Sequence, residues 1–497
     1  MNALNREDAL RLAAQLVMID IPGTALDPAT EDLLARYPLR AVCLFRRNLS
    51  GVDGTRALNA ALQARLGPKA LIAIDQEGGA VSRATFIPVA PSAMALGAIG
   101  SAARAEQIGA AVARGLAHLG VNWNFAPVLD VNNNPANPVI GERSFSEHPD
   151  DVARLASAWM AGSLREGVAC CVKHFPGHGD THEDSHHALP QVNKSLDELE
   201  ALELRPFRAL KNQAPALMTA HIVYPQLDAE LPATLSRFFL TELLRQRIGF
   251  QGVVITDALM MRAIADRWGH AKAAVLALQA GADLVLAQGT VDEQVATLGA
   301  VADALQDGRL PLESAQQAVA RVDALAERYP VSLRDYAQGQ RADDEALMHA
   351  TCAEALTTLR GARAPLGALR VITQKSVISD GVSEAGLSAD EVATLWSPGT
   401  DIEWFHVPDL GTLQATDIPR DGRTNVLVSN RRGRYPGAAN WPIDLHIALW
   451  NPFQALDVPT PTVLSWGYQR PMLAALRRWL AGDLTAQGRA PVAALEL

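Results

Sequence analysis

The hydrophobic positions of the chain follow two alternating patterns between residue 12 and about residue 290. Short, nearly continuous apolar runs are typical of buried parallel strands, and the longer segments between them carry apolar residues every three or four positions, as amphipathic helices do. The predicted strands are 16–19, 41–45, 71–75, 122–127, 169–174, 216–222, 252–256 and 283–287. The predicted helices include 55–66, 103–119, 151–166, 196–211, 236–248 and 269–280. This alternation predicts an α/β fold.

Eight such strands favour a (β/α)8 TIM-like barrel, and the pattern alone leaves a doubly wound sheet open. Helices 291–306 and 311–328 are expected to complete this domain. Residues 329–344 have the composition of a linker, and a helix is predicted at 345–359. A second alternation follows, with strands 369–372, 402–407, 425–429, 445–450 and 462–464 and a helix 471–480. We therefore expect a barrel domain (1–335), a linker and connecting helix (336–364) and a smaller α/β sandwich-type C-terminal domain (365–497).

Polar side chains collect at the ends of several predicted strands. Asp75 and Asp257 each end an apolar run, Lys173 and His174 end the fifth run, and His221 lies near the end of the sixth. In a barrel of parallel strands, catalytic groups gather at this edge. Singly, each of these residues could be a helix cap or a member of an ion pair at the barrel mouth. Together they predict one functional site.

The segment 173–187 is crowded with histidines and carboxylates and is interrupted by Pro176, Gly177 and Gly179. Within it, Asp184 and His186 are two residues apart. A carboxylate at this spacing can fix the tautomer of the imidazole and support its protonated form. With an ordinary pKa of about 6.5, such a histidine can donate and take back a proton near neutrality. The alternative is a solvated polar loop without a catalytic role.

Residues 182–186 also match the H-E-x-x-H pattern of zinc peptidases. That pattern binds metal from a helix, where positions i and i+4 share one face. Here the segment lies between a glycine-rich turn and Pro190, and no third ligand follows at a recognisable spacing. We therefore expect no metal and no cofactor, and a zinc peptidase is the least favoured class.

Composition narrows the partners. The chain has 497 residues, 48% of them hydrophobic and 20% charged, which is typical of a globular protein. A net charge of −10 argues against a nucleic-acid or anionic-membrane partner. The four cysteines are expected to be buried thiols: Cys43, Cys170, Cys171 and Cys352. No run approaches the length of a membrane span and the first residues lack an apolar signal region, so a cytoplasmic enzyme is expected.

Several motifs resemble one enzyme family. Residues 173–181, Lys-His-Phe-Pro-Gly-His-Gly-Asp-Thr, followed by Asp184-Ser185-His186, resemble the signature of the β-N-acetylglucosaminidase (β-N-acetylhexosaminidase) branch of glycoside hydrolase family 3. Further stretches resemble the same family in the same order: 75–79, 124–130, 137–145, 218–222 and 255–259. The resemblance covers roughly residues 10–330, and 464–468 is similar to the second domain that many members carry.

The resemblance implies a retaining mechanism through a covalent glycosyl-enzyme. Asp257 then matches the nucleophile, His186 the general acid/base and Asp184 its dyad partner. The residues that match sugar-binding positions are Asp75, Arg83, Arg143, Lys173 and His174. The chain departs from the family pattern at Ala80, where arginine is expected, and at Ala84, where phenylalanine is expected. Both positions lie in the loop after the third strand.

The resemblance favours an exo-acting β-N-acetylglucosaminidase. It would act on a small carbohydrate, either a GlcNAc-containing oligosaccharide or a muropeptide, from chitin-type or peptidoglycan fragments. A β-N-acetylglucosaminide phosphorylase would use the same residues with phosphate as the acceptor. A β-glucosidase is less favoured, because glucosidase members usually take their acid/base from elsewhere. A non-catalytic sugar-binding protein on the same fold is the remaining alternative, and the oligomeric state is open.

Overall fold

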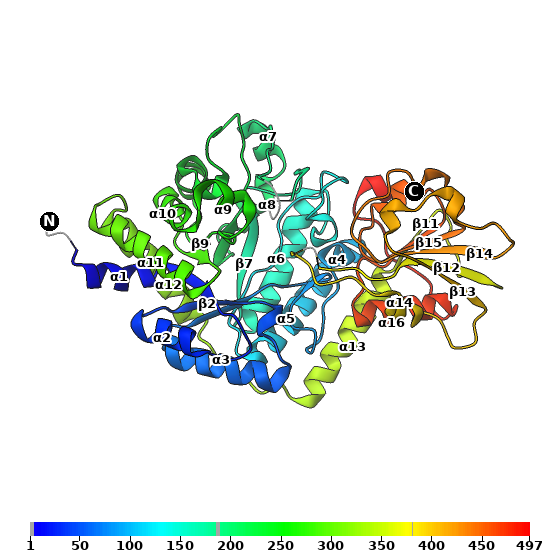
Figure 1. Ribbon diagram of the computed structural model, residues 1–497, viewed down its shortest axis with the longest axis horizontal. Coiled ribbons are helices and arrows are strands. Elements are labelled where there is room, and N and C mark those ends of the chain that lie inside the picture. Colours follow the sequence, from blue (N-terminus) through cyan, green and yellow to red (C-terminus); the bar gives the residue numbers. More distant parts are fainter. Residues whose placement is uncertain (1–3, 185–188, 380) are drawn as a thin grey trace.

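The computed structural model describes residues 4–184, 189–379 and 381–497, and it consists of two domains joined by one long helix (Figure 1). The first domain is built on an eight-stranded sheet with the order β10-β1-β2-β3-β6-β7-β8-β9, in which every pairing is parallel. Its strands are β1 (Val17–Asp20), β2 (Ala41–Leu44), β3 (Leu71–Ile74), β6 (Trp123–Asn124), β7 (Ala169–Phe175), β8 (Ala216–Thr219), β9 (Val253–Ile255) and β10 (Val285–Ala287).

The sheet closes on itself where β9 meets the start of β10. Ile255 forms a parallel bridge with Leu284, and the Thr256 N–H donates a hydrogen bond to the Leu284 carbonyl at 3.1 Å. The predicted barrel is therefore confirmed, and the doubly wound alternative is wrong. Closure brings the carboxyl ends of all eight strands to one rim.

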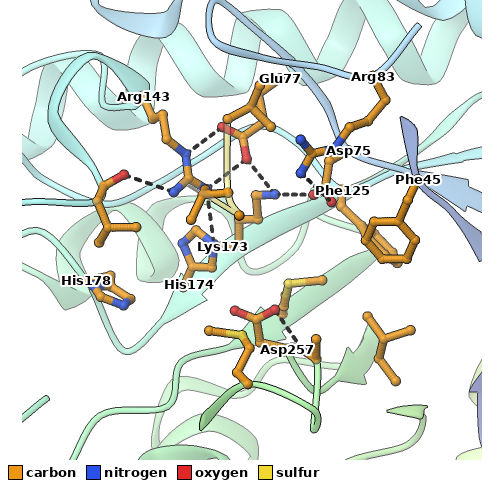
Figure 2. A pocket seen from close by; sticks show the side chains of 18 of the residues that line it. Phe45, Asp75, Glu77, Arg83, Phe125, Arg143, Lys173, His174, His178 and Asp257 are labelled. Atoms are coloured by element: carbon orange, nitrogen blue, oxygen red, sulfur yellow. Dashed lines mark hydrogen bonds and ion pairs between the residues drawn. The ribbon is translucent and has the colours of Figure 1, made fainter. Parts of the chain in front are cut away.

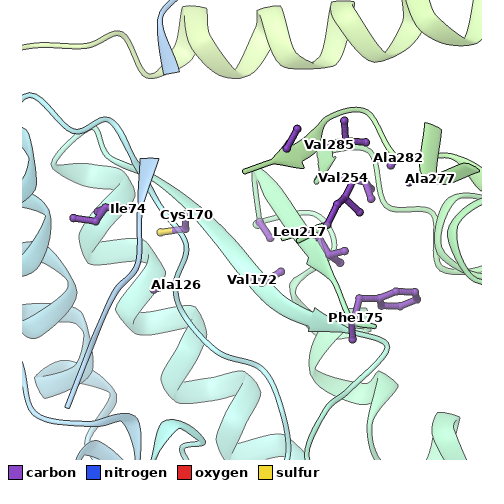
Figure 3. Packing of buried hydrophobic residues seen from close by; sticks show 14 of the residues in the cluster. Ile74, Ala126, Cys170, Val172, Phe175, Leu217, Val254, Ala277, Ala282 and Val285 are labelled. Carbon is purple, nitrogen blue, oxygen red and sulfur yellow. The ribbon is translucent and has the colours of Figure 1, made fainter. Parts of the chain in front are cut away.

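Alternate strand residues supply two cores, because successive side chains point to opposite faces of the sheet. One set fills the barrel, among them Cys43, Ala73 and Cys171. The other set packs outward against the helices, and Figure 3 shows members of it on neighbouring strands, with Val172 and Val254 labelled. All four cysteines are buried thiols, as expected.

The helices around the barrel follow the predicted segments closely. They include α3 (Val52–Leu66), α5 (Ala102–Leu119), α6 (Pro149–Arg165), α10 (His270–Ala280), α11 (Val291–Gln306) and α12 (Leu312–Arg328). The predicted helix 196–211 is instead two helices, α7 (Leu196–Ala201) and α8 (Leu204–Leu210). Pro206 explains the break, because it has no N–H to donate to the carbonyl of Leu202 and its ring would clash there. Residues Phe238–Ile248 form a π-helix rather than an α-helix.

The second domain contains a six-stranded sheet with the order β11-β16-β15-β14-β12-β13. The strands are β11 (Thr357–Leu359), β12 (Leu369–Gln374), β13 (Ile402–Val407), β14 (Thr424–Ser429), β15 (Leu445–Ala448) and β16 (Thr462–Leu464). β11 runs antiparallel to β16, and the other pairings are parallel. The helices are α14 (Ala389–Ala393), α15 (Gln454–Asp457) and α16 (Arg470–Leu480).

The connection between the domains differs from the prediction. The helix α13 (Gln338–Ala355) begins inside the predicted linker, and residues 357–359, predicted to end that helix, form β11. Asp344 shows why the polar composition was misleading. It is buried and accepts hydrogen bonds from Arg114 of α5 and from the Tyr336 hydroxyl at 2.6 Å. Polar residues in this stretch therefore attach α13 to the barrel.

The two domains share an apolar contact surface. Met94, Ala95 and Ala98 of α4 (Ala93–Ile99) belong to the same buried cluster as Leu359 and Trp466 of the second domain. In Figure 1, α13 extends from the barrel to the second domain beside this contact. Within the described ranges, no helix has both the length and the apolar composition needed to cross a bilayer.

Candidate active site

A pocket of about 130 Å³ lies at the carboxyl ends of the barrel strands (Figure 2). Six of the eight residues predicted for the site line it: Asp75, Arg83, Arg143, Lys173, His174 and Asp257. The other lining residues are Phe45, Glu77, Val81, Phe125, Val139, His178, Met218, Ala258, Met261, Leu286, Gln288, Gly381 and Val382. The barrel thus brings together predicted site residues that are up to 182 positions apart in the sequence (Asp75 and Asp257).

A short hairpin shapes one side of the pocket. Its strands, β4 (Gln76–Gly78) and β5 (Val81–Ser82), directly follow β3. Gly78 and Gly79 turn the chain with φ values of 104° and 58°, in the left-handed region where glycine is favoured. The Gln76 side chain bonds both ways with the backbone of Ala84, at 3.0 and 3.2 Å. These bonds fix the position of Arg83, which follows the hairpin.

Cations and carboxylates form one buried network along this side. The Lys173 Nζ lies 2.7 Å from Asp75 Oδ1 and 2.6 Å from Glu77 Oε1. Arg143 donates two hydrogen bonds to Glu77, both of 2.9 Å. Burial by itself raises the pKa of the Glu77 carboxyl, but the charges of Arg143 and Lys173 hold that pKa well below its usual range. Glu77 is therefore ionised and joins the two cations.

The same charges keep Lys173 protonated. Its side chain is only 2% exposed, and burial alone lowers the pKa of an ammonium group. The carboxylates of Asp75 and Glu77 outweigh burial and raise the pKa of Lys173 above its ordinary value. An uncompensated charge in such a place would be strongly destabilising. The network therefore offers fixed donors and acceptors to a ligand with hydroxyl groups.

His174 is oriented by Asp130, which is fully buried. The His174 Nδ1 lies 2.7 Å from Asp130 Oδ2, and the other oxygen of this carboxylate accepts the backbone N–H of His178 at 2.7 Å. Burial alone raises the pKa of Asp130, yet the His174 ring and these bonds lower it below its usual range. The ionised carboxylate favours a proton on Nδ1, which leaves Nε2 directed toward Arg143 at 3.5 Å.

Asp257 lies across the pocket from this network, just after β9 (Figure 2). Its Oδ1 accepts a hydrogen bond from the Ala258 N–H at 2.7 Å. Met218 and Met261 line the same pocket. His221 does not line the pocket, but its Nε2 lies 3.0 Å from the Ala258 carbonyl, so it contacts the backbone next to Asp257.

The predicted dyad is described only in part. His186 lies outside the described residues, as do Ser185, His187 and Ala188. Asp184 is half-buried and is not one of the described residues that line the pocket. His182 and Glu183 are exposed and not helical. In the described parts of the chain, no three His, Cys, Asp or Glu side chains form a group that could hold a metal ion.

Four residues that shape the site were not predicted: Glu77, Asp130, His178 and Glu384. Glu77, Asp130 and His178 lie within motifs that carry the family resemblance, so their place in those motifs was an available signal. Glu384 belongs to the second domain and accepts a hydrogen bond from Arg83 Nη1 at 2.9 Å. Nothing in the local sequence around Glu384 indicates this contact.

Comparison with known proteins agrees with the geometry. Residues 11–325 match the model of the glycosyl hydrolase family 3 N-terminal domain. The chain is 36% identical to β-hexosaminidase A of Pseudoalteromonas piscicida, over 62% of this chain and 56% of the relative, so it spans just over half of that relative's length. It is 40% identical to the β-hexosaminidase of Chromobacterium violaceum, over 58% of this chain and 82% of the relative.

A solved structure resembles the chain over its whole length. It is a glycoside hydrolase family 3 β-N-acetylglucosaminidase from Paenibacillus sp. str. FPU-7, with 32% identity, a TM-score of 0.86 and full coverage of both chains. Both domains of the present chain therefore have counterparts in one known enzyme. The family resemblance found in the sequence is confirmed: this chain belongs to glycoside hydrolase family 3 and is a glycoside hydrolase.

Proposed function

We propose that the chain is a retaining exo-β-N-acetylglucosaminidase that removes a terminal, non-reducing β-linked GlcNAc. The observation that carries this proposal is the pocket itself, in which a buried row of paired charged groups lies across from the carboxylate of Asp257. The names of the relatives support the choice of an N-acetylhexosamine as the sugar.

Asp257 is proposed as the nucleophile. It attacks the anomeric carbon, the glycosidic bond breaks, and a covalent glycosyl-enzyme forms. The Ala258 N–H holds Oδ1 at 2.7 Å and thereby orients the carboxylate. The apolar neighbours keep much of the bulk water away from the acylal ester until a water molecule is activated for its hydrolysis.

His186 is proposed as the acid/base, with Asp184 as its partner. The imidazolium gives its proton to the departing glycosidic oxygen, and the neutral imidazole then takes a proton from the attacking water. Asp184 would stabilise the charged form of the ring. This assignment rests on the family signature in residues 173–186.

The five polar residues opposite Asp257 are proposed to bind the sugar hydroxyls. Asp75 accepts hydrogen bonds, whereas Lys173, Arg83 and Arg143 donate them, and the oriented His174 ring accepts through Nε2. Because these groups are already held by one another, the sugar meets a preorganised site and little reorganisation is needed. The substrates are proposed to be chitin-type oligosaccharides or muropeptides that end in GlcNAc.

The test is turnover of 4-nitrophenyl β-GlcNAc by the wild type and by His186→Ala, with and without phosphate and with and without a chelator. An activated leaving group needs little acid assistance, so the variant should lose mainly the second step and show a burst of nitrophenol. Wild-type behaviour of His186→Ala would contradict the dyad. Release of GlcNAc 1-phosphate with phosphate would identify a phosphorylase instead. Loss of activity with the chelator would indicate a metal enzyme.

A further inference from the structure

A loop of the second domain, between β12 and α14, lies directly against the sugar pocket. Gly381 and Val382 line that pocket, and the Glu384 carboxylate accepts the hydrogen bond from Arg83. The backbone of Glu384 is held from two sides. Its N–H donates to the Ala80 carbonyl at 2.9 Å, and its carbonyl accepts from the Tyr468 hydroxyl at 2.9 Å. The carboxylate is thereby aimed at Arg83.

A second cavity, of about 410 Å³, lies on the other side of this contact. The same two segments line both spaces. Val81 and Arg83 face the sugar pocket, whereas Ser82 faces the cavity. Val382 faces the sugar pocket, whereas Glu384 faces the cavity. The Arg83–Glu384 pair is therefore a thin partition between a small pocket and a larger cavity.

Asp75 and Arg83 lie across the pocket from Asp257 (Figure 2). In the proposed mechanism Asp257 attacks C1, so we take the ring atoms farthest from C1, among them O4, to face Asp75 and Arg83. Arg83 Nη2 lies 3.8 Å from Asp75 Oδ2, and its side chain is only 10% exposed. A ring joined through its C4 oxygen to a further sugar would meet the partition.

We infer that Glu384 is a positioning residue that holds Arg83 beside Asp75 and closes the sugar pocket at its non-reducing end, so that the site accepts one terminal ring. This inference rests on the proposed function for the orientation of the sugar. The second domain would then contribute to the affinity for the sugar and would limit cleavage to terminal residues. Burial lowers the pKa of Arg83, but Asp75 and Glu384 more than compensate and raise it above its ordinary value, so the residue stays charged between the two carboxylates.

The departure from the family pattern at Ala80 fits this assignment. Ala80 is 2% exposed and packs in the apolar cluster of the second domain, and its carbonyl accepts the Glu384 N–H. An arginine at this position would have to place a charged side chain in that cluster, which is unfavourable without a partner. The small residue lets the second domain approach closely enough for Glu384 to reach Arg83.

The cavity behind the partition contains a polar side chain that could bind a ligand. Gln469 lines it and is 9% exposed, and neither carboxamide atom has a hydrogen-bond partner among the described residues. A buried amide of this kind gains free energy from a ligand that supplies a donor and an acceptor. The acetamido group of a second GlcNAc ring has both. Removal of the Glu384 side chain is therefore expected to open usable space.

The experiment compares Glu384→Ala and Glu384→Gln with Arg470→Ala. Arg470 is an exposed residue of the same cavity wall and serves as the matched control. For 4-nitrophenyl β-GlcNAc, the loss of a hydrogen bond to a charged group predicts a KM about 10- to 100-fold higher in Glu384→Ala, with kcat changed by no more than about threefold. Glu384→Gln should recover most of the affinity, because its amide oxygen still accepts from Arg83. Arg470→Ala should match the wild type.

The first product from 4-nitrophenyl β-chitobioside gives an independent readout. The wild type should release GlcNAc first, whereas Glu384→Ala should also release intact chitobiose with nitrophenol. An unchanged KM and an unchanged product order in Glu384→Ala would overturn the inference. So would an equal rise of KM in Arg470→Ala, or a fall of melting temperature and kcat without any change in KM, which would assign Glu384 to domain packing alone.

Calorimetric binding of free GlcNAc separates this inference from the proposed function. Weaker binding in Glu384→Ala with normal binding in Arg470→Ala supports the positioning role even if no glycoside is hydrolysed. Normal hydrolysis by the wild type with unaltered binding in Glu384→Ala removes the inference and leaves the proposed function intact. A wild type that neither binds GlcNAc nor cleaves its glycosides overturns both.

Discussion

The two walls of the sugar pocket are built on opposite principles. On one wall Asp75, Glu77, Lys173 and Arg143 neutralise one another, so each buried charge has a partner. On the other wall the Asp257 carboxylate accepts the Ala258 N–H, and Met218, Met261 and Leu286 line the pocket as well. A wall of paired charges suits sugar recognition, because the ion pairs fix the positions of hydrogen-bond donors and acceptors and leave no charge free to react. A carboxylate in an apolar wall suits covalent chemistry.

The largest expected effect is a loss of activity when the carboxylate of Asp257 is removed. Asp257→Ala should reduce kcat by about 10⁴-fold or more, because the proposed covalent intermediate forms on the carboxylate that this change removes. Its melting temperature should fall less than that of Lys173→Ala, because the ion pairs of the opposite wall join Asp75, Glu77, Lys173 and Arg143. Steady-state kinetics and thermal melting measured together check this. Residual turnover within a hundredfold of the wild type would mean that the nucleophile is another residue.

The opposite wall should respond in stability. Lys173→Ala removes the cation that Asp75 and Glu77 share. Glu77 keeps Arg143 and Asp75 keeps Arg83, so the loss should be about 2 kcal/mol, smaller than the roughly 3 to 5 kcal/mol of a fully uncompensated buried charge. Urea unfolding of the variant beside Asp257→Ala measures the difference. Equal stability of the two variants would show that the network contributes little to folding.

Low pH should also lower the folding stability of the wall opposite Asp257, through His178. Burial, reinforced by the nearby His174 ring, lowers the pKa of His178 to about 4. An unfolded histidine has a pKa of about 6.5, so between these values the unfolded chain binds the extra proton. The contribution of His178 to stability is therefore complete above about pH 6.5 and is lost as the pH falls toward 4, by about 3 kcal/mol in total.

The variant His178→Asn removes this proton uptake. Its free energy of unfolding should change less between pH 7.5 and pH 4.5 than that of the wild type, as measured by urea titration at each pH. Parallel curves for the two proteins would assign the acid sensitivity to other groups.

The smallest expected effect follows from a change at Trp450, a residue of the second domain that contacts the neighbour of Arg143. Trp450 Nε1 donates a hydrogen bond at 3.0 Å to Glu142, the neighbour of Arg143, and Glu142 is buried. Trp450→Phe should lower stability by about 1 kcal/mol and raise KM slightly, with kcat unchanged. Thermal melting and steady-state kinetics detect both. A large fall in kcat would instead link Trp450 to the chemistry.

The sequence predicted the barrel well because each strand is a short apolar run whose buried faces leave little ambiguity. It also predicted the residues at the strand ends, such as Asp75 and Asp257, because polar groups there stand out against the apolar runs. The break between α7 and α8 was missed, because the apolar spacing continues through 196–211 although Pro206 cannot donate to the carbonyl of Leu202. The start of α13 was missed because the polar composition of residues 329–344 indicated a linker. In the fold, one of these polar residues, Asp344, is buried and paired with Arg114.

Glu384 illustrates the remaining limit. Its role depends on a contact with Arg83, which is 301 positions earlier in the sequence, and no local pattern encodes the packing of one domain on another. Glu77 is different, because it lies two residues after Asp75 in a recognised motif, and its pairing with Lys173 and Arg143 became visible only through barrel closure. Long-range charge pairs are specified by the fold rather than by neighbouring residues.

In the proposed mechanism Asp257 carries the sugar during the reaction. The direct measurement is mass spectrometry of His186→Ala mixed with 4-nitrophenyl β-GlcNAc and quenched in acid within the burst. We expect a protein heavier by one N-acetylhexosamine residue, with the added mass on the peptide that contains Asp257. Protein that stays unlabelled during a clear burst, or a label on any other peptide, would contradict it.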